Sequence, residues 1–151
     1  MPQPGKPTAS DNQSAGDPEP EELILHARHA YERAYAPYSG YHVGAAVLTS
    51  KGKVYTGCNI ENAVYPLTLC AERVAIFKAI SEGATSIRAL AVVTENAGPP
   101  CGSCRQVIRE FGDEETIIYI ADTEGVFRTR RLKNLLPESF SAADLSPQDE
   151  S

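Results

Sequence analysis

The sequence predicts an α/β domain in which helices sandwich a single mixed five-stranded sheet. Its 151 residues are enough to bury the core of one domain. Helix-like and strand-like segments alternate in the middle of the chain, which favours at least some parallel strand pairing. One strand-like segment, residues 87–94, is apolar almost throughout, as expected of a strand that is buried on both faces.

The first predicted helix begins near Asp17 and ends at Pro37. Asp17 is a residue type that caps helices, and Pro18 would occupy the first helical position, where its missing N–H costs nothing. A proline disfavours helical geometry in the residue before it, so Pro37 ends the segment. Apolar residues recur at helical spacing and would form one buried stripe: Leu23, Ile24, Ala27, Ala30, Tyr31, Ala34 and Tyr35.

Two strands follow at 42–49 and 53–60, because both segments are rich in β-branched and small residues, and the turn at 50–52 joins them as a hairpin. A helix at 70–82 stops at Gly83. Its residues available for burial are Val74, Ala75, Phe77 and Ile80. The later elements are the strand at 87–94, a helix at 102–111, strands at 116–121 and 126–130, and a helical turn at 131–136.

Composition separates the body of the chain from its ends. Residues 1–16 lack Val, Ile, Leu and aromatic residues, so we expect a disordered tail that cannot offset the entropy lost on ordering. Residues 17–145 should form the domain and residues 146–151 a flexible C-terminus. The net charge is −6, but the segment 23–136 carries 13 basic and 11 acidic residues. This nearly neutral body argues against a polyanion such as nucleic acid as the main partner and suits a small, weakly charged ligand.

No apolar segment approaches the roughly 18 residues of a membrane span. The N-terminus also lacks the apolar stretch of a secretory signal. We therefore expect a cytoplasmic protein with no membrane partner. In a reducing compartment the four cysteines should be thiols or metal ligands rather than disulfide partners.

Two cysteine motifs lie at the starts of predicted helices: Cys-Ala-Glu at 70–72 and Pro-Cys-Gly-Ser-Cys at 100–104. Backbone N–H groups and the helix dipole favour thiolates at such positions. Thiolates of Cys70, Cys101 and Cys104 converging on zinc would leave its fourth tetrahedral position open, as in catalytic zinc sites.

Glu72 is the candidate for moving the protons of a water made acidic by zinc. On a regular helix it would lie about 200° around the axis from Cys70, so its access depends on the irregular first turn. Other interpretations of the cysteines remain open at this point. Cys101 and Cys104 could be a redox pair or merely buried thiols. Cys58 could close a structural zinc site as a fourth ligand, or could be a small core residue.

Six short segments carry a resemblance to a known family: 36–39 (APYS), 43–46 (VGAA), 57–63 (GCNIENA), 70–73 (CAER), 100–107 (PCGSCRQV) and 135–137 (LLP). On these motifs the chain resembles the cytidine deaminases of nucleoside salvage, specifically the small homotetrameric type with three cysteine zinc ligands. The resemblance covers about residues 22–145. It implies a three-layer fold and hydrolytic deamination of cytidine and 2′-deoxycytidine to uridine and 2′-deoxyuridine, with release of ammonia.

The resemblance also implies the metal site, with one Zn²⁺ ion per chain. Cys70, Cys101 and Cys104 match the zinc ligands, and Glu72 matches the proton shuttle. Arg73 matches a residue that supports the thiolates, where its guanidinium would offset their negative charge.

Five residues match substrate-binding positions of the family. Asn59 and Glu61 match a pair that hydrogen-bonds the ribose hydroxyls. Tyr41 matches a position beside the base and sugar that is usually Phe, so its hydroxyl needs a partner or water. Tyr65 and Phe140 match aromatic residues donated by neighbouring subunits, which implies a homotetramer with shared active sites.

The chain departs from the family pattern at 96–99, which looks shorter than usual and has Pro99 where Ser is common. This departure concerns the rim of the pocket and not the ligands. Two other classes of deaminase fit the sequence less well. Blasticidin S deaminases would not be expected to carry the ribose signature at 59–62, and nucleic-acid-editing enzymes need a basic stripe with interleaved aromatic residues that the body lacks.

Overall fold

The structure, a computed structural model, describes residues 19–145 and confirms a single mixed five-stranded sheet flanked by helices. The strands are β1 (Val43–Thr49), β2 (Val54–Cys58), β3 (Ile87–Thr94), β4 (Ile117–Ala121) and β5 (Phe127–Arg131). The helices are α1 (Pro20–Tyr31), α2 (Ala71–Ser81), α3 (Gly102–Phe111) and α4 (Leu132–Leu135), with 3₁₀ turns η1 (Tyr65–Leu67) and η2 (Ala142–Leu145). Within this described part no helix has the length and apolar character needed to cross a bilayer.

The strand order β2-β1-β3-β4-β5 combines both kinds of pairing. β1 is antiparallel to β2 and β3, and β5 is antiparallel to β4. The β3–β4 pair is parallel, as the alternation of helices and strands predicted, and α3 forms the connection between its strands. Because β1 and β3 are antiparallel, the beginning of β1 and the carboxyl end of β3 lie at the same end of the sheet, with Val43 opposite Thr94.

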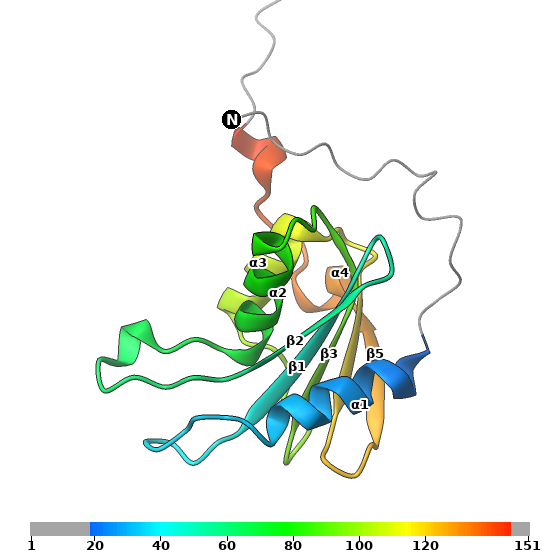
Figure 1. The fold of residues 1–151 in the computed structure, drawn as a ribbon. Helices are drawn as coiled ribbons and strands as arrows, with labels where there is room; N and C mark the ends of the chain where they lie inside the picture. The colour runs from blue at the N-terminus through cyan, green and yellow to red at the C-terminus, as the bar shows by residue number, and fades with distance from the viewer. Residues whose placement is uncertain (1–18, 146–151) are drawn as a thin grey trace, which may run out of the picture.

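Side chains that alternate along the central strands supply two cores, one on each face of the sheet. Ala46 and Leu48 of β1 pack with α1, whereas Ala45 and Val47 pack with α2 and α3. Figure 1 shows α1 crossing one face while α2 and α3 lie on the other. The molecule therefore has the three layers that the family resemblance implied.

Helix α1 is shorter than the apolar stripe predicted, because the chain leaves the helix after Tyr31. Tyr35 instead forms a parallel bridge with Ile60: its N–H donates to the Asn59 carbonyl, and its own carbonyl accepts from Glu61 N–H, both at 2.9 Å. The N-cap is Glu19 and Pro20 occupies the first turn. The predicted cap Asp17–Pro18, the tail 1–16 and the C-terminus 146–151 lie outside the described residues.

The buried face of α2 also differs from the prediction. Phe77 was expected to be buried but is 43% exposed, and Ile76 is fully buried in its place. The helix turns toward the sheet the face that carries Ala71, Ala75, Ile76 and Ala79, which has the i, i+4, i+8 spacing of one stripe. Small residues on this face let the helix lie close to the strands.

Two glycines mark where helices approach the sheet too closely for any side chain. A Cβ at Gly44 of β1 would lie 2.1 Å from the Ala27 carbonyl oxygen of α1. A Cβ at Gly57 of β2 would lie 2.5 Å from Ala75 N and 2.7 Å from the Ala71 carbonyl oxygen of α2. Gly57 therefore sets the position of the first turn of α2.

Candidate metal centre and active site

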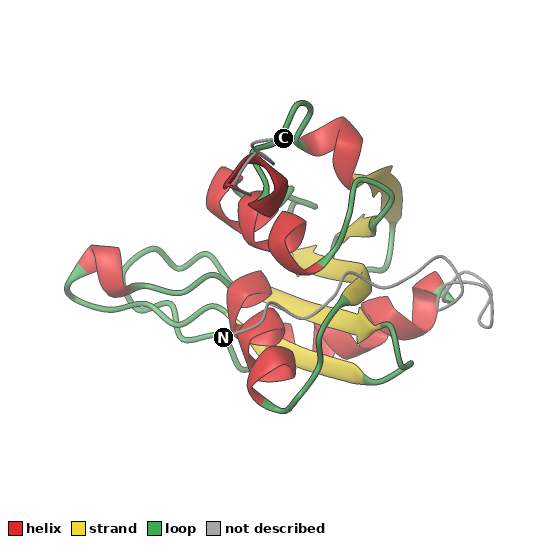
Figure 2. Cartoon of the chain, turned by 90° about the horizontal axis from the view of Figure 1, so that it is seen from above, coloured by secondary structure: helices red, strands yellow, loops and turns green. Residues whose placement is uncertain are grey.

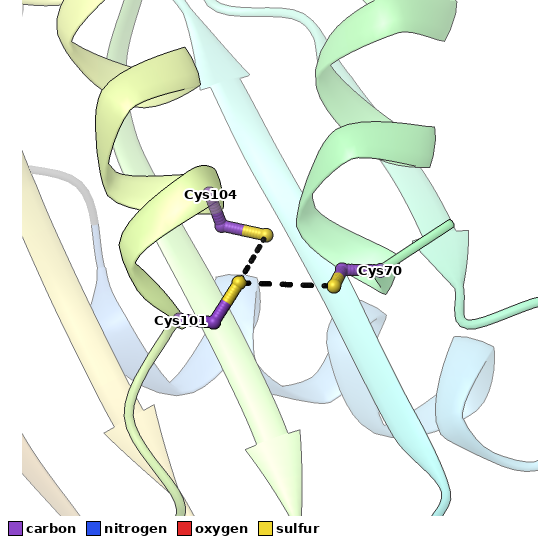
Figure 3. A group of neighbouring side chains, drawn as sticks. All are labelled: Cys70, Cys101 and Cys104. Carbon is purple, nitrogen blue, oxygen red and sulfur yellow. Dashed lines mark hydrogen bonds between the residues drawn. The ribbon is translucent and has the colours of Figure 1, made fainter. Parts of the chain in front are cut away.

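Helices α2 and α3 begin side by side near the carboxyl end of β3, and their first residues carry three cysteines (Figure 3). Cys70 is the N-cap residue of α2, Cys101 is the N-cap residue of α3, and Cys104 lies in the first turn of α3. Neither sulfur is used to cap the backbone N–H groups of its own helix, so both thiols remain available to a ligand. Functional groups gather at this end of the strands in many open α/β sheets.

The three sulfur atoms have the spacing that a tetrahedral metal ion requires. All three Sγ atoms lie within 4.8 Å of one another, with 3.9 Å between Cys70 and Cys101 and 3.5 Å between Cys101 and Cys104. Zinc–sulfur bonds of about 2.3 Å at tetrahedral angles place sulfurs about 3.8 Å apart. Cys104 is buried and Cys101 is exposed, so the cluster is accessible from one side. The donor set therefore fits zinc with an open coordination position.

The electrostatics of the cluster also favour a cation. The hydrogen bond with Cys104, reinforced by the Arg73 guanidinium, lowers the pKa of Cys70 to about 5. The same hydrogen bond, together with burial, raises the pKa of Cys104. One thiolate therefore forms readily, but further ionisation requires positive charge between the sulfurs. Arg73 supplies part of it, since its Nη2 donates to Cys70 Sγ at 3.4 Å, and its buried Nε has no partner in the described structure.

Glu72 lies beside the cluster although it follows Cys70 by only two residues. Cys70 has an extended backbone (φ −71°, ψ 151°) outside the helix, so the regular helical angle between the two side chains does not apply. The Glu72 side chain is 3% exposed and shares a hydrogen bond with Cys104. Burial raises the pKa of this carboxyl group. The arrangement places a proton-accepting and proton-donating group next to the candidate metal.

Asn59 is 7% exposed and has a structural task within the chain. Its Oδ1 accepts from Val43 N–H at 2.9 Å and its Nδ2 donates to the Tyr41 carbonyl at 2.7 Å. An amide has a second donor hydrogen and further acceptor capacity, so these contacts do not exhaust it. The side chain thereby fixes the backbone that leads into β1.

Glu61 organises the loop that precedes β1. Its Oε1 accepts from the backbone N–H groups of Tyr38 and Ser39, at 2.9 and 3.1 Å, and its Oε2 accepts from the Ser39 hydroxyl. The Ser39 hydrogen bonds lower the pKa of Glu61, so the group stays a carboxylate. Ser39 belongs to the APYS motif, but nothing in the local sequence indicates that it orients Glu61, 22 residues away.

Tyr41 finds its hydroxyl partner in the loop before the second cysteine motif. Its Oη donates to Asn96 Oδ1 at 2.8 Å, and a Cβ at Gly98 would lie 2.4 Å from that hydroxyl. Asn96 Oδ1 also accepts from Thr94, whose Oγ1 accepts from Gly98 N–H. The segment 96–99, which departs from the family pattern, is thus held against Tyr41. The partner is 55 residues away in sequence, and no local signal identifies it.

The two aromatic residues assigned to neighbouring subunits are mostly exposed in the single chain. Tyr65, in η1, is 69% exposed and packs edge-on against Tyr38, with ring centroids 5.9 Å apart. Phe140 is 57% exposed and lies in the segment that follows α4. Figure 2 shows the loop with η1 projecting away from the body of the domain.

Cys58 lies apart from the three-sulfur cluster. Its thiol donates to the Arg33 carbonyl at 3.4 Å, and the candidate metal-binding group within residues 19–145 contains only the other three cysteines. All four cysteines are free thiols. This geometry supports an open three-cysteine site over a closed four-cysteine one.

Comparisons with known proteins identify the family of the chain. The family described as "Cytidine and deoxycytidylate deaminase zinc-binding region" matches residues 18–120. The chain is 49% identical over 128 residues to a cytidine deaminase of Sporosarcina psychrophila, which covers 83% of this chain and 94% of that protein. A cytidine deaminase of Halalkalibacterium halodurans is 48% identical over 126 residues, covering 82% and 96%.

Solved structures give the same result. The crystal structure of cytidine deaminase from Burkholderia pseudomallei matches with a TM-score of 0.75 and 46% identity, covering 79% of this chain and 97% of that one. Cytidine deaminase from Mycobacterium tuberculosis matches with a TM-score of 0.72 and 43% identity, covering 82% and 98%. The similarity therefore extends over almost the whole of each of these proteins.

Proposed function

Because the chain belongs to the cytidine and deoxycytidylate deaminase family, we propose that it catalyses zinc-dependent hydrolytic deamination of cytidine and 2′-deoxycytidine. Water replaces the C4 amino group, giving uridine or 2′-deoxyuridine and ammonia, a reaction of pyrimidine salvage. The observation that carries this proposal is a three-sulfur cluster, open on one side, with the buried Glu72 carboxyl group beside it.

The proposed chemistry divides between the metal and Glu72. Zinc bound by Cys70, Cys101 and Cys104 would supply a Lewis acid that lowers the pKa of a water molecule to about 7. Glu72 accepts a proton from the attacking water and delivers one to N3 of the cytosine ring. It then passes the second proton to the C4 amino group, which leaves as ammonia. The water oxygen becomes the C4 carbonyl of the product, and N3 keeps its proton.

Arg73 keeps the sulfur cluster from becoming too electron-rich. Three thiolates around a divalent ion leave one net negative charge, which would weaken the ion as an electrophile. The Arg73 guanidinium donates to Cys70 Sγ and offsets this charge. The Nε of the same guanidinium is buried and lacks a hydrogen-bond partner among the described residues.

The sugar would be held by Asn59 and Glu61, with the base beside Tyr41. Contacts within the chain support these roles, because hydrogen bonds from Val43 and Ser39 hold the two side chains in place before a ligand arrives. A carboxylate that accepts and an amide that both donates and accepts can bind two vicinal hydroxyls.

We infer that the protein works as a homotetramer with shared active sites. Tyr65 and Phe140 are exposed aromatic residues in a single chain, and Val64 and Leu67 beside Tyr65 are also more than half exposed. A projecting loop with this much exposed apolar surface is normally covered by another protein surface. In the proposed assembly, neighbouring chains cover the loop and receive its aromatic residue.

We propose that the protein acts on a small nucleoside in the cytoplasm, with no nucleic acid or membrane as partner. Zinc binding by Cys70, Cys101 and Cys104 requires reduced cysteines, and a reducing compartment maintains them. The nearly neutral body suits an uncharged nucleoside better than a polyanion.

The test of the reaction is Glu72→Gln, with zinc content and turnover measured on the same preparation. Glu82→Gln is the matched control, because Glu82 lies exposed at the other end of α2. Glu72→Gln should keep stoichiometric zinc and lose about 10²–10⁴-fold in kcat for cytidine. The control should retain both. Near-normal turnover by Glu72→Gln, or faster turnover of blasticidin S or a single-stranded oligonucleotide than of cytidine, would reject the proposal.

The test of shared sites mixes two inactive variants. Glu72→Gln chains keep Phe140, and Phe140→Ala chains keep Glu72. In co-refolded or co-expressed tetramers, a site with an intact Glu72 can receive Phe140 from a neighbouring Glu72→Gln chain, so activity should recover. The control places both substitutions on one chain and mixes it with the Phe140→Ala chain; Glu72 is then intact in some sites but no chain supplies Phe140, so activity should not recover. Failure of the first mixture to recover, despite verified mixed tetramers, contradicts sharing through Phe140.

A further inference from the structure

Arg105 follows the cysteine Cys104 in α3, and its side chain turns back over the segment that holds two of the proposed ligands. Its Nε donates to the Pro100 carbonyl at 2.8 Å, and its backbone N–H donates to the Cys101 carbonyl at 3.0 Å. Pro100 is fully buried, so its carbonyl is held in a region with little access to water. Arg105 therefore donates to two successive carbonyls, those of Pro100 and Cys101, at the start of the Cys101–Cys104 turn.

The same guanidinium makes a second contact, on a distant part of the chain. Its Nη1 donates to the Leu135 carbonyl at 2.7 Å. Leu135 ends α4 and begins the segment 135–140, which leads to Phe140. The planar guanidinium presents its donors at fixed angles, so the two carbonyls are held in a fixed relation to each other.

Helix α3 holds the far end of the segment 135–140 as well. Gln106 Nε2 donates to the Phe140 carbonyl at 2.8 Å, and Arg109 Nε donates to Ser139 Oγ at 2.9 Å. The helix that carries Cys104 thus fixes the segment at both ends. Of the three anchoring side chains, Arg105 alone also contacts the backbone beside Cys101.

We propose that Arg105 is a positioning residue that couples the metal-binding turn to the segment that carries Phe140. A distortion of the Cys101–Cys104 turn would displace the segment 135–140. Displacement of that segment would in turn loosen the Cys101–Cys104 turn. The expected effect of Arg105 on zinc affinity depends only on zinc binding by the cysteines. The expected effect of Arg105 on substrate binding rests on the proposed function, in which Phe140 covers a nucleoside.

The test compares Arg105→Lys and Arg105→Gln with Arg109→Gln, which removes a segment anchor that does not touch the turn. Zinc affinity is measured by competition with a chelator in the absence of nucleoside, and KM and kcat are measured with cytidine. Supporting groups around metal ligands are typically worth 10–100-fold in metal affinity. The Arg105 variants should lose about this much zinc affinity and also show a raised KM. Arg109→Gln should raise KM and leave zinc affinity unchanged.

Two outcomes overturn the coupling: zinc affinity of both Arg105 variants equal to that of the parent protein, or an equal loss in Arg109→Gln. If the Arg105 variants do not fold, the parent protein itself supplies the test through hydrogen exchange. Removal of zinc should speed amide exchange in 135–140, while the hairpin turn at 122–125 and the core strand β3 stay unchanged. Unaltered exchange in 135–140 would overturn the proposal. Neither zinc affinity nor exchange depends on cytidine being the substrate, so failure of the proposed function remains distinguishable.

Discussion

Replacement of Gly57 by alanine should distort the proposed metal site, because Gly57 packs against the start of α2. The new Cβ would lie 2.5 Å from Ala75 N and 2.7 Å from the Ala71 carbonyl oxygen, whereas ordinary contact begins at 3.4 Å. These two are backbone atoms within the first five residues of α2, and Val74 Cβ lies 2.9 Å away as well, so the start of the helix must move by roughly 1 Å. The first turn of the helix carries Glu72 and follows Cys70 directly.

The expected magnitude follows from this displacement. Overpacking of this kind costs about 1–3 kcal/mol of stability. A misplacement of about 1 Å between catalytic groups can cost about 10²-fold in rate. Gly57→Ala should therefore unfold at lower denaturant concentration, bind zinc more weakly and deaminate cytidine about 10²-fold more slowly.

Gly44→Ala is the matched control, because the same methyl group would meet α1 on the other face of the sheet, 2.1 Å from the Ala27 carbonyl oxygen. This variant should be destabilised at least as much, yet its folded fraction should keep normal zinc affinity. The assays are urea unfolding, chelator competition and the absorbance change on cytidine. Equal zinc affinity in the two glycine variants would refute the reasoning that Gly57 positions the site.

The remaining predictions concern the Tyr41–Asn96 hydrogen bond, Cys58, the backbone at Ala97 and removal of the metal. Tyr41→Phe and Asn96→Ala should each raise KM for cytidine, and the double variant should be little worse than either, with a coupling energy of about 1 kcal/mol in a double-mutant cycle; strictly additive effects would contradict the shared hydrogen bond. Cys58→Ser should keep stoichiometric zinc and turnover by metal analysis and kinetics, because its thiol bonds to a backbone carbonyl outside the cluster. Ala97→Gly should stabilise the protein by about 0.5 kcal/mol in urea unfolding, since Ala97 has a left-handed backbone (φ 52°) that glycine adopts more easily. Exhaustive chelation should abolish activity and added zinc should restore it, so full activity without metal would remove the basis of the mechanism.

Local patterns in the sequence predicted the order of the five strands and four α-helices, with bounds within about two residues except at α1, but they did not predict the 3₁₀ turns η1 and η2. The strand at 87–94 and the helix at 102–111 coincide with β3 and α3. Their signals are local: a continuous apolar run marks the strand, and Cys101 and Gly112 flank the helix. The end of α1 and the buried face of α2 were wrong, because both depend on partners far away in sequence. Tyr35 leaves the helical stripe to pair with Ile60, and Phe77 turns outward because the sheet receives the small residues of α2.

The sequence by itself determined the chemistry available to this protein: three cysteines in two helix-starting motifs, a glutamate two residues after the first, and the short strings that match one enzyme family. Only the tertiary structure decided which groups meet. It brought three sulfurs within 4.8 Å, buried Glu72 beside Cys104, paired Tyr41 with Asn96 and linked Pro100 to Leu135 through Arg105. The physical reason is that residue types and spacings specify local conformation and reactivity, whereas contacts between distant segments depend on how the sheet and its helices pack.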